Sequence, residues 1–165
     1  MDGFNVMASH LEFTTRSPGE TRKLGRSLGE LAAPGDIFLL VGKLGAGKTC
    51  LTQGIARGLG IKESVLSPSF VLVRELKGRV PLYHIDLYRL DRLEEISELG
   101  LDEYLFGNGL TVVEWASKGI EVLPEEHLLI EIEYLVDDER RTKISANGKR
   151  YEELLGKLEE KLKVA

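Results

Sequence analysis

The chain has 165 residues, 42% of them hydrophobic and 30% charged, with a formal net charge of −5. These values fit one soluble domain over residues 1–165 and argue against a surface that binds nucleic acid throughout, because phosphate binding needs clustered Lys and Arg. Cys50 is the one cysteine, residues 1–15 lack the apolar stretch of a signal peptide, and the longest apolar run is too short to span a bilayer, so we expect a cytoplasmic protein without a membrane partner.

The first part of the chain predicts a strand, a helix and a second strand. Residues 11–14 suit a short strand. Residues 17–20, Ser-Pro-Gly-Glu, are typical of a helix start, with a cap, a first-position proline and a capping box. Leucines at helical spacing follow until Pro-Gly at 34–35 ends the helix. Residues 37–41 are continuously apolar, as in a strand that is buried on both faces.

The rest of the chain alternates between helical and strand patterns. This order predicts an α/β fold of three layers, with a mixed, mostly parallel central sheet and flanking helices, as in phosphate-loop NTPases. The expected elements are a helix over 48–59, strands over 70–76 and 80–85, a helix over 91–99, a buried strand over 110–113, a hairpin of strands 127–135 and 141–145, and a final amphipathic helix carrying Tyr151, Leu154, Leu155, Leu158 and Leu162.

Residues 42–49, Gly-Lys-Leu-Gly-Ala-Gly-Lys-Thr, match the phosphate-loop pattern G-x-x-x-x-G-K-[ST]. Glycines keep such a loop open for successive backbone N–H groups to wrap a phosphate, and the next helix directs its N-terminal dipole at the same anion. We expect Lys48 to reach the β- and γ-phosphates and Thr49 to bind Mg²⁺. The sequence lacks Asn-Lys-x-Asp, which favours ATP over GTP. The nucleotide-binding residues predicted here are Gly42, Leu44, Gly45, Ala46, Gly47, Lys48 and Thr49.

Two later segments place carboxylates where phosphate-loop enzymes hold magnesium. Residues 110–114 are four strand-forming residues followed by Glu114, the pattern expected of a second metal ligand. Asp86 ends another expected strand, where a catalytic role and a turn or cap role are equally compatible with its residue type.

The neighbours of these carboxylates have more than one interpretation. His84 suits a core or edge histidine, and Tyr88 suits a surface residue. Arg89 could also lie at the surface, or it could stabilise phosphate charge as an arginine finger does. Residues 67–70, Ser-Pro-Ser-Phe, lie where nucleotide switches carry a sensing hydroxyl, although an ordinary Ser-Pro turn is the simpler interpretation.

As a set, these motifs resemble those of the TsaE (YjeE) family of ATPases in order and spacing. The likeness runs from the first helix to the C-terminal hairpin. Many unrelated proteins share the phosphate loop, whereas the segments His-x-Asp-x-Tyr-Arg and Glu-Trp are far more specific. After the loop, the matching residues are Ser67-Pro68-Ser69-Phe70, His84-Ile85-Asp86-Leu87-Tyr88-Arg89 and Val113-Glu114-Trp115.

The resemblance implies a slow ATPase that supports synthesis of N6-threonylcarbamoyladenosine in tRNA. Its partners would be TsaD, which carries the transfer chemistry, and TsaB, so tRNA would be contacted only indirectly. By the same resemblance, Thr49 and Glu114 hold Mg²⁺, Asp86 and Glu114 are the catalytic candidates, and Ser17 and Arg140 lie near the adenine. The switch or partner-facing residues would be Ser67, Pro68, Ser69, Phe70, His84, Tyr88, Arg89 and Trp115.

Three positions depart from the usual family pattern. Lys43 stands where the family has Asp and adds positive charge beside the phosphates. Ser69 replaces Thr and keeps the hydroxyl of a switch residue. Cys50 replaces a second Thr after the loop, and its backbone N–H can still bind a phosphate.

Two other functions are compatible with a phosphate loop. A small-molecule kinase, for a nucleoside or metabolite, needs an acceptor pocket and usually an Arg-rich lid. The basic residues between 140 and 150 are better interpreted as a solvated hairpin than as such a lid. The other alternative is a nucleotide-sensing adaptor without enzymatic activity. Release of inorganic phosphate from ATP without an acceptor distinguishes the ATPase from both.

Overall fold

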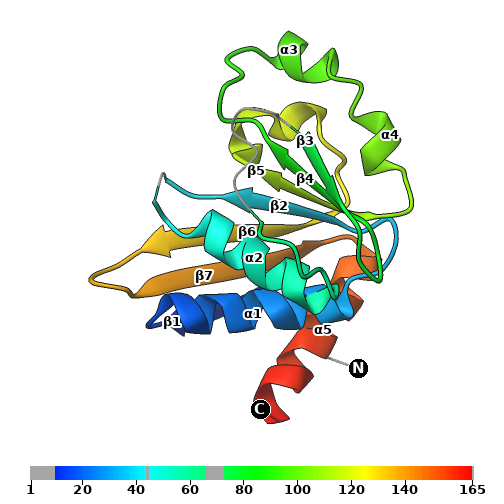
Figure 1. The fold of residues 1–165 in the computed structure, drawn as a ribbon. Coiled ribbons are helices and arrows are strands. Elements are labelled where there is room, and N and C mark those ends of the chain that lie inside the picture. The colour runs from blue at the N-terminus through cyan, green and yellow to red at the C-terminus, as the bar shows by residue number, and fades with distance from the viewer. Residues whose placement is uncertain (1–9, 44, 66–72, 165) are drawn as a thin grey trace, which may run out of the picture.

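A single mixed sheet forms the centre of the molecule. The computed structural model describes residues 10–43, 45–65 and 73–164, and within them the strand order is β1-β7-β6-β2-β5-β4-β3 (Figure 1). The strands are β1 (His10–Thr15), β2 (Ile37–Val41), β3 (Val73–Leu76), β4 (Leu82–Asp86), β5 (Leu110–Glu114), β6 (His127–Tyr134) and β7 (Arg140–Asn147). The helices are α1 (Pro18–Leu31), α2 (Lys48–Gly58), α3 (Leu93–Ser97), α4 (Asp102–Leu105) and α5 (Lys149–Val164), with the 3₁₀ turns η1 (Ala116–Lys118) and η2 (Ile120–Val122).

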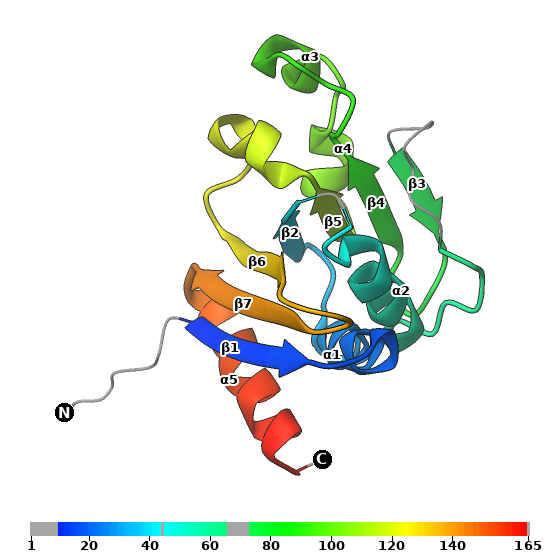
Figure 2. The same ribbon diagram turned by 90° about the vertical axis from the view of Figure 1, so that its left-hand side faces the viewer.

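The four middle strands of the sheet run parallel. β2 lies between β6 and β5, and β5 pairs in turn with β4, whereas β1, β7 and β3 add antiparallel edges. Parallel strands end at the same edge of a sheet, so β2, β4 and β5 bring their carboxyl ends together. Figure 2 looks onto that edge. The phosphate loop leaves the sheet there.

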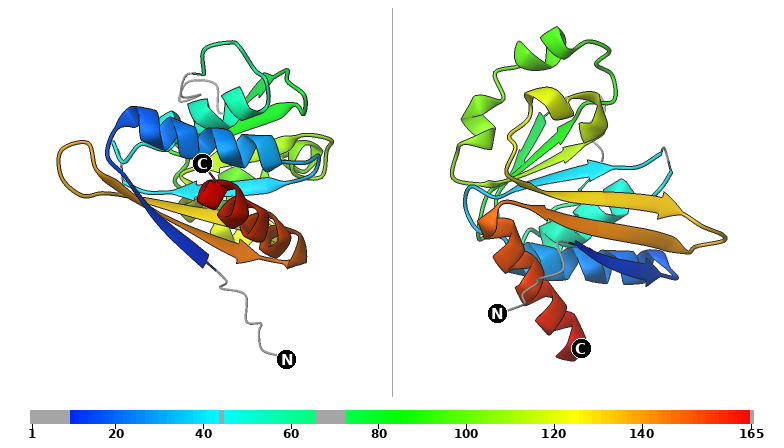
Figure 3. Two further views of the ribbon diagram at one scale, coloured as in Figure 1. Left: turned by 90° about the horizontal axis from the view of Figure 1, so that it is seen from below. Right: turned by 180° about the vertical axis from the view of Figure 1, so that it is seen from behind.

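Successive side chains of the buried strands point to opposite faces of the sheet and pack into two different cores, which gives three layers. In β2, Phe38 and Leu40 belong to the core shared with α1, α2 and α5, whereas Ile37 and Leu39 belong to the core under α3, α4 and η1. Both cores are apolar, which is why β2 reads as a continuous hydrophobic run rather than an alternating one. The predicted fold class is therefore confirmed, and Figure 3 shows α1 and α5 crossing the same face of the sheet.

Helices α1 and α2 approach closely because small residues face one another. Gly25 and Gly29 of α1 meet Gly54 and Gly58 of α2, and each pair is spaced by four residues, one helical turn. A Cβ atom on Gly29 would overlap the carbonyl oxygen of Ile55 in α2. This contact holds α2, which follows the phosphate loop, against α1.

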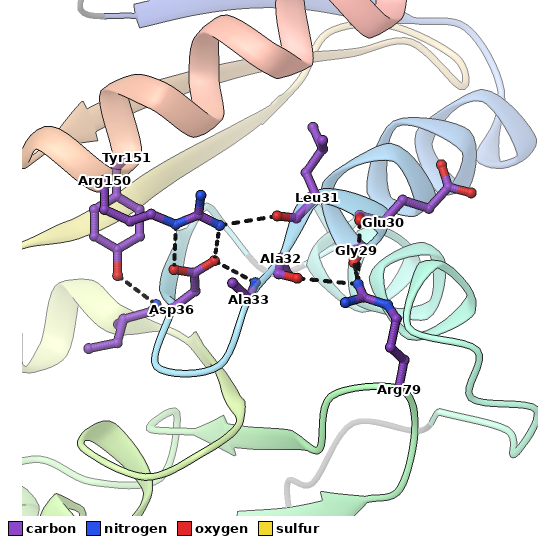
Figure 4. Close-up of polar contacts among 10 residues, drawn as sticks. Gly29, Glu30, Leu31, Ala32, Ala33, Asp36, Arg79, Arg150 and Tyr151 are labelled. Carbon is purple, nitrogen blue, oxygen red and sulfur yellow. Dashed lines mark hydrogen bonds and ion pairs between the residues drawn. The ribbon is translucent and has the colours of Figure 1, made fainter.

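Two arginines from distant parts of the chain cap the carboxyl end of α1, whose last turn holds no basic residue of its own (Figure 4). Arg79 donates through Nη2 to the carbonyl of Gly29 at 2.8 Å. Arg150 donates to the carbonyl of Leu31 at 3.1 Å and forms a bidentate ion pair with Asp36, at 2.7 and 2.9 Å. Cations at this end oppose the negative pole of the helix dipole. The contacts tie β2, α5 and the β3–β4 turn to one helix terminus.

Several predicted boundaries differ from the structure. The helix expected over residues 91–99 is shorter in the structure, where α3 spans Leu93–Ser97. Its start is delayed by two residues because Glu95 accepts the backbone N–H groups of Asp91 and Arg92 and so caps the helix there. The carboxylate of Glu20 accepts the N–H of Arg16, where a capping box on Ser17 was predicted, while Ser17 Oγ accepts the N–H of Glu20 as expected. The sequence pattern did not predict α4 or the two 3₁₀ turns. Residues 70–72 of the strand expected over 70–76 lie outside the described part.

Candidate functional site

The phosphate loop connects β2 to α2, as the motif requires. Gly47 precedes the helix with φ of 108°, a left-handed conformation that favours glycine. Gly42 is equally constrained, because a Cβ atom there would lie 2.6 Å from the carbonyl oxygen of Ile132 in β6. Leu44 lies outside the described residues. Glycine is thus required at both positions, as expected of a phosphate-binding loop.

Lys48 begins α2 and is almost completely buried, with 5% of its surface exposed. Its ammonium donates to the carbonyl oxygens of Gly42, at 2.5 Å, and Lys43, at 3.0 Å, and lies 4.0 Å from the centroid of the Trp115 ring. Burial lowers the pKa of Lys48, and the negative charges of Glu114 and Asp86 act in the opposite direction. Lys48 is therefore a buried cation held between its own loop and two carboxylates.

The two predicted carboxylates are neighbours at the carboxyl edge of the sheet. Asp86 and Glu114 are register partners on β4 and β5, and they are 3% and 2% exposed. Asp86 accepts the backbone N–H of Tyr88 at 2.8 Å, so it also has the turn role that its residue type allowed. Glu114 Oε2 binds the Nε2 atom of the buried His84. Both interpretations of Asp86 thus stay open: it caps a turn, and it lies beside Lys48.

One residue of this cluster was missed at the sequence level. Thr52 lies on α2 one turn after Lys48, and its hydroxyl donates to the carbonyl of Lys48 at 2.9 Å. The same hydroxyl lies 3.5 Å from Glu114 Oε2, so it links the helix to the carboxylate. The spacing from Lys48 to Thr52, four residues on a predicted helix, places both on one face and is the signal that could have identified it.

Aromatic and basic side chains cover the carboxylate edge. Trp115 follows β5 in a left-handed conformation, with φ of 59°, and contacts Tyr88 edge to face with ring centroids 4.8 Å apart. Lys118 donates to the carbonyl oxygens of Tyr88 and Leu90 and so stabilises the turn that follows β4. Arg89 lies exposed in the same turn. Of the residues that the resemblance had grouped as switch or partner-facing, the structure brings Tyr88 and Trp115 together at this edge, whereas His84 is buried.

A small pocket of about 80 Å³ opens beside the loop, between the start of α1 and the β6–β7 hairpin. Arg140 lines it and donates through Nε to the carbonyl of Ala46 at 2.8 Å, while its guanidinium stacks 4.5 Å from the ring centroid of Tyr134. The resemblance predicted that Arg140 lies near the adenine, and that role stays a prediction. Ser17 caps α1, and its neighbour Pro18 contributes to the wall. The lining residues are Pro18, Thr21, Gly47, Cys50, Asp138 and Arg140.

The carboxylates, hydroxyls and loop fit a magnesium ion that is shared with a nucleotide. Among the described residues, no three Cys, His, Asp or Glu side chains gather into a metal cage. Mg²⁺ bound to nucleotides takes only one or two carboxylates, and phosphates and water complete its shell. Glu114 and the half-buried Thr49 supply that kind of oxygen donor set. The predicted residues Ser67, Pro68, Ser69 and Phe70 lie outside the described part of the chain.

No helix within the described residues is long and apolar enough to cross a membrane.

Comparison with known proteins adds family information to this geometry. Residues 15–143 match the family model described as "Threonylcarbamoyl adenosine biosynthesis protein TsaE". A TsaE protein of Bacillus subtilis is 46% identical over 149 residues, covering 90% of this chain and 93% of its own, and one of Treponema pallidum is 39% identical, covering 79% and 97%. A crystal structure of YdiB from Bacillus subtilis superimposes with a TM-score of 0.82 at 43% identity, covering 92% of this chain and 95% of its own.

Proposed function

Because this chain belongs to the TsaE family of threonylcarbamoyl adenosine biosynthesis proteins, we propose that it binds ATP with Mg²⁺ and hydrolyses it slowly in support of that tRNA modification. The supporting relatives carry the pathway in their names and align over most of their length. The hydrolytic activity itself is an inference from the site.

The position of Lys48 carries the proposal. A buried ammonium at the N-terminus of a helix, with two buried carboxylates on the adjacent strand ends, is a poor structural ion pair, because burying several charges costs more than their attraction returns. The same arrangement suits a triphosphate, which pairs with the ammonium, and Mg²⁺, which pairs with carboxylates. The site therefore favours nucleotide chemistry over a purely structural role.

The residues divide into binding and chemical roles. The loop N–H groups and Lys48 would bind the phosphates, and Thr49 and Glu114 would hold Mg²⁺, which neutralises the charge of the β- and γ-phosphates when bound. Asp86 would position the attacking water or accept its proton, since it is the second buried carboxylate at this edge. The small pocket between α1 and the hairpin would border the adenosine portion, with Arg140 at its wall.

We propose that the hydrolysis acts on an assembly of this chain with TsaD and TsaB. The acidic chain, with a net charge of −5, is poorly suited to hold tRNA by itself. Within the described residues, nearly every element packs into one nucleotide-binding fold, so the transfer chemistry belongs to another subunit.

Phosphate release from ATP, measured without any acceptor and then with the TsaD–TsaB pair, tests this function. We expect slow release from the chain alone and a changed rate with the pair. Phosphate release that appears only with a small-molecule acceptor would replace this proposal with a kinase, and tight ATP binding without turnover in either condition would leave an adaptor.

A further inference from the structure

We infer that His84 is a positioning residue, which fixes the carboxylate of Glu114 so that one oxygen stays available for Mg²⁺; this inference rests on the proposed function. His84 had only the interpretations of a core histidine or, by resemblance, a partner-facing residue. The structure places it inside the molecule instead, with none of its surface exposed.

The backbone register puts His84 behind the carboxylate. Side chains at positions 82, 84 and 86 of β4 share one face of the sheet, and His84 is the register partner of Val112, two residues before Glu114 on β5. Glu114 therefore lies diagonally across from His84, and Asp86 lies directly beside Glu114. A ring on this strand can therefore reach the carboxylate from the core side.

The hydrogen bonds show which oxygen is held. His84 Nε2 binds Oε2 of Glu114, and the Thr52 hydroxyl lies 3.5 Å from the same oxygen. The Thr52 proton already goes to the carbonyl of Lys48 at the shorter distance of 2.9 Å, so His84 is the principal donor to Oε2. Fixing one oxygen of a carboxylate limits its rotation and thereby directs the other.

The remaining ring nitrogen supports a fixed orientation. His84 Nδ1 is buried and has no hydrogen-bond partner among the described residues. Within the described residues, Glu114 is thus the one hydrogen-bond partner of the imidazole. A histidine kept in the core for packing alone would not need to face the proposed metal ligand. Groups behind a metal-binding carboxylate commonly change metal affinity tenfold to a hundredfold.

Two amide variants of different reach test the inference. The amide nitrogen of glutamine extends about as far from the backbone as Nε2, whereas that of asparagine extends only as far as Nδ1. We would measure binding of a non-hydrolysable ATP analogue with saturating Mg²⁺ and with EDTA, and take the ratio of the two affinities. H84N should lower this ratio about tenfold or more, with little change in the affinity measured with EDTA. H84Q should keep most of the wild-type ratio.

A second buried histidine provides the matched control. His127 begins β6, where its Nδ1 lies 2.8 Å from the carbonyl of Pro124, away from the loop. The asparagine amide of H127N can still reach the carbonyl of Pro124, so this variant should keep the wild-type ratio. If H84N does not fold, H84L, which also removes the donor, takes its place with the same expectation.

The possible failures are distinguishable. A wild-type ratio in H84N, or an equal loss in H84N and H84Q, overturns the positioning role and leaves the proposed function intact. If the wild-type chain itself binds the analogue equally with and without Mg²⁺, the metal site of the proposed function is overturned, and this inference with it.

Discussion

At the scale of single residues, the site is a set of buried charges whose protonation should govern binding. Lys48, Asp86 and Glu114 are each at most 5% exposed, and the two carboxylates raise the pKa of Lys48 while burial lowers it by more. The proposed function gives them separate roles, so they can be tested separately: Lys48 would bind the phosphates, and Asp86 would position the attacking water.

ATP affinity should fall with rising pH before the ordinary lysine pKa of 10.5 is reached. The pKa of Lys48 is lowered by burial, so the folded chain holds fewer protons than the unfolded one between that pKa and 10.5, and in this window stability rises with pH. A triphosphate binds the charged ammonium, so its affinity declines in the same window. Calorimetric titration from neutral to about pH 10 measures this.

Lys48→Arg is the control, because a guanidinium keeps its charge throughout this range. The ATP affinity of this variant should be weaker than that of the wild-type chain but constant over the pH range. A wild-type affinity that stays constant over the whole titration would contradict the assigned environment of Lys48.

Asp86→Asn should separate chemistry from binding. The amide oxygen can still accept the N–H of Tyr88, so the turn is kept, while the negative charge is removed. ATP affinity should stay within a few-fold and phosphate release should slow roughly a hundredfold, the usual scale for losing a positioned base. Single-turnover phosphate release checks the rate. A wild-type rate would assign Asp86 to the turn alone.

At the scale of elements, two helices that touch through glycines position the loop. The α1–α2 contact joins the wall of the small pocket to the phosphate loop, because Pro18 and Thr21 belong to α1 and Lys48 begins α2. The arginine caps at the far end of α1 hold the same helix against β2 and α5. Rigid helices of this kind favour a preformed site.

Gly29→Ala should destabilise the fold by roughly 1–3 kcal/mol or more, because the added methyl group overlaps the backbone of α2. Gly19→Ala is the matched control in the same helix: its Cβ would lie 3.7 Å from Ser17 Oγ, an ordinary contact, so helix propensity should make it neutral or stabilising by up to about 1 kcal/mol. Urea denaturation measures both. Equal stability of the two variants would exclude tight glycine packing.

The elements that were predicted correctly have strong local patterns. β2, α2, β5, the β6–β7 hairpin and α5 were recognisable because their hydrophobic periods are regular and turn residues bound them. By contrast, α4 and the 3₁₀ turns are three or four residues long, too short for a period, and depend on tertiary packing. The positions of Asp86 and Glu114 at strand ends were predicted. Their pairing and the contact between His84 and Glu114 depend on register, which no local pattern specifies.

At the scale of the whole molecule, the proposal requires nucleotide and partner to influence each other. The Trp115 ring lies against Lys48 and contacts Tyr88, which is 43% exposed, so a partner can reach a side chain that is linked to the site. Binding linkage requires that a nucleotide which tightens partner binding is itself bound more tightly by the same factor.

Affinity for the TsaD–TsaB pair should therefore depend on the nucleotide. We expect it to be highest with a non-hydrolysable ATP analogue, lower with ADP and lowest with neither, with a ratio of roughly 5- to 150-fold as for typical coupling energies. Surface plasmon resonance in the three states provides the measurement. Equal affinity in all three would exclude nucleotide-gated docking, and no binding in any state would count against the proposed partners.

The central claim is that the loop from Gly42 to Thr49 binds a triphosphate through Lys48, and isothermal titration of Lys48→Ala with ATP and Mg²⁺ tests it most directly. The account predicts that this variant keeps its fold, as judged by circular dichroism, and loses most of its affinity for ATP, with a smaller loss for adenosine, because only the phosphates contact the ammonium. A folded Lys48→Ala variant that binds ATP as tightly as the wild-type chain would contradict the claim.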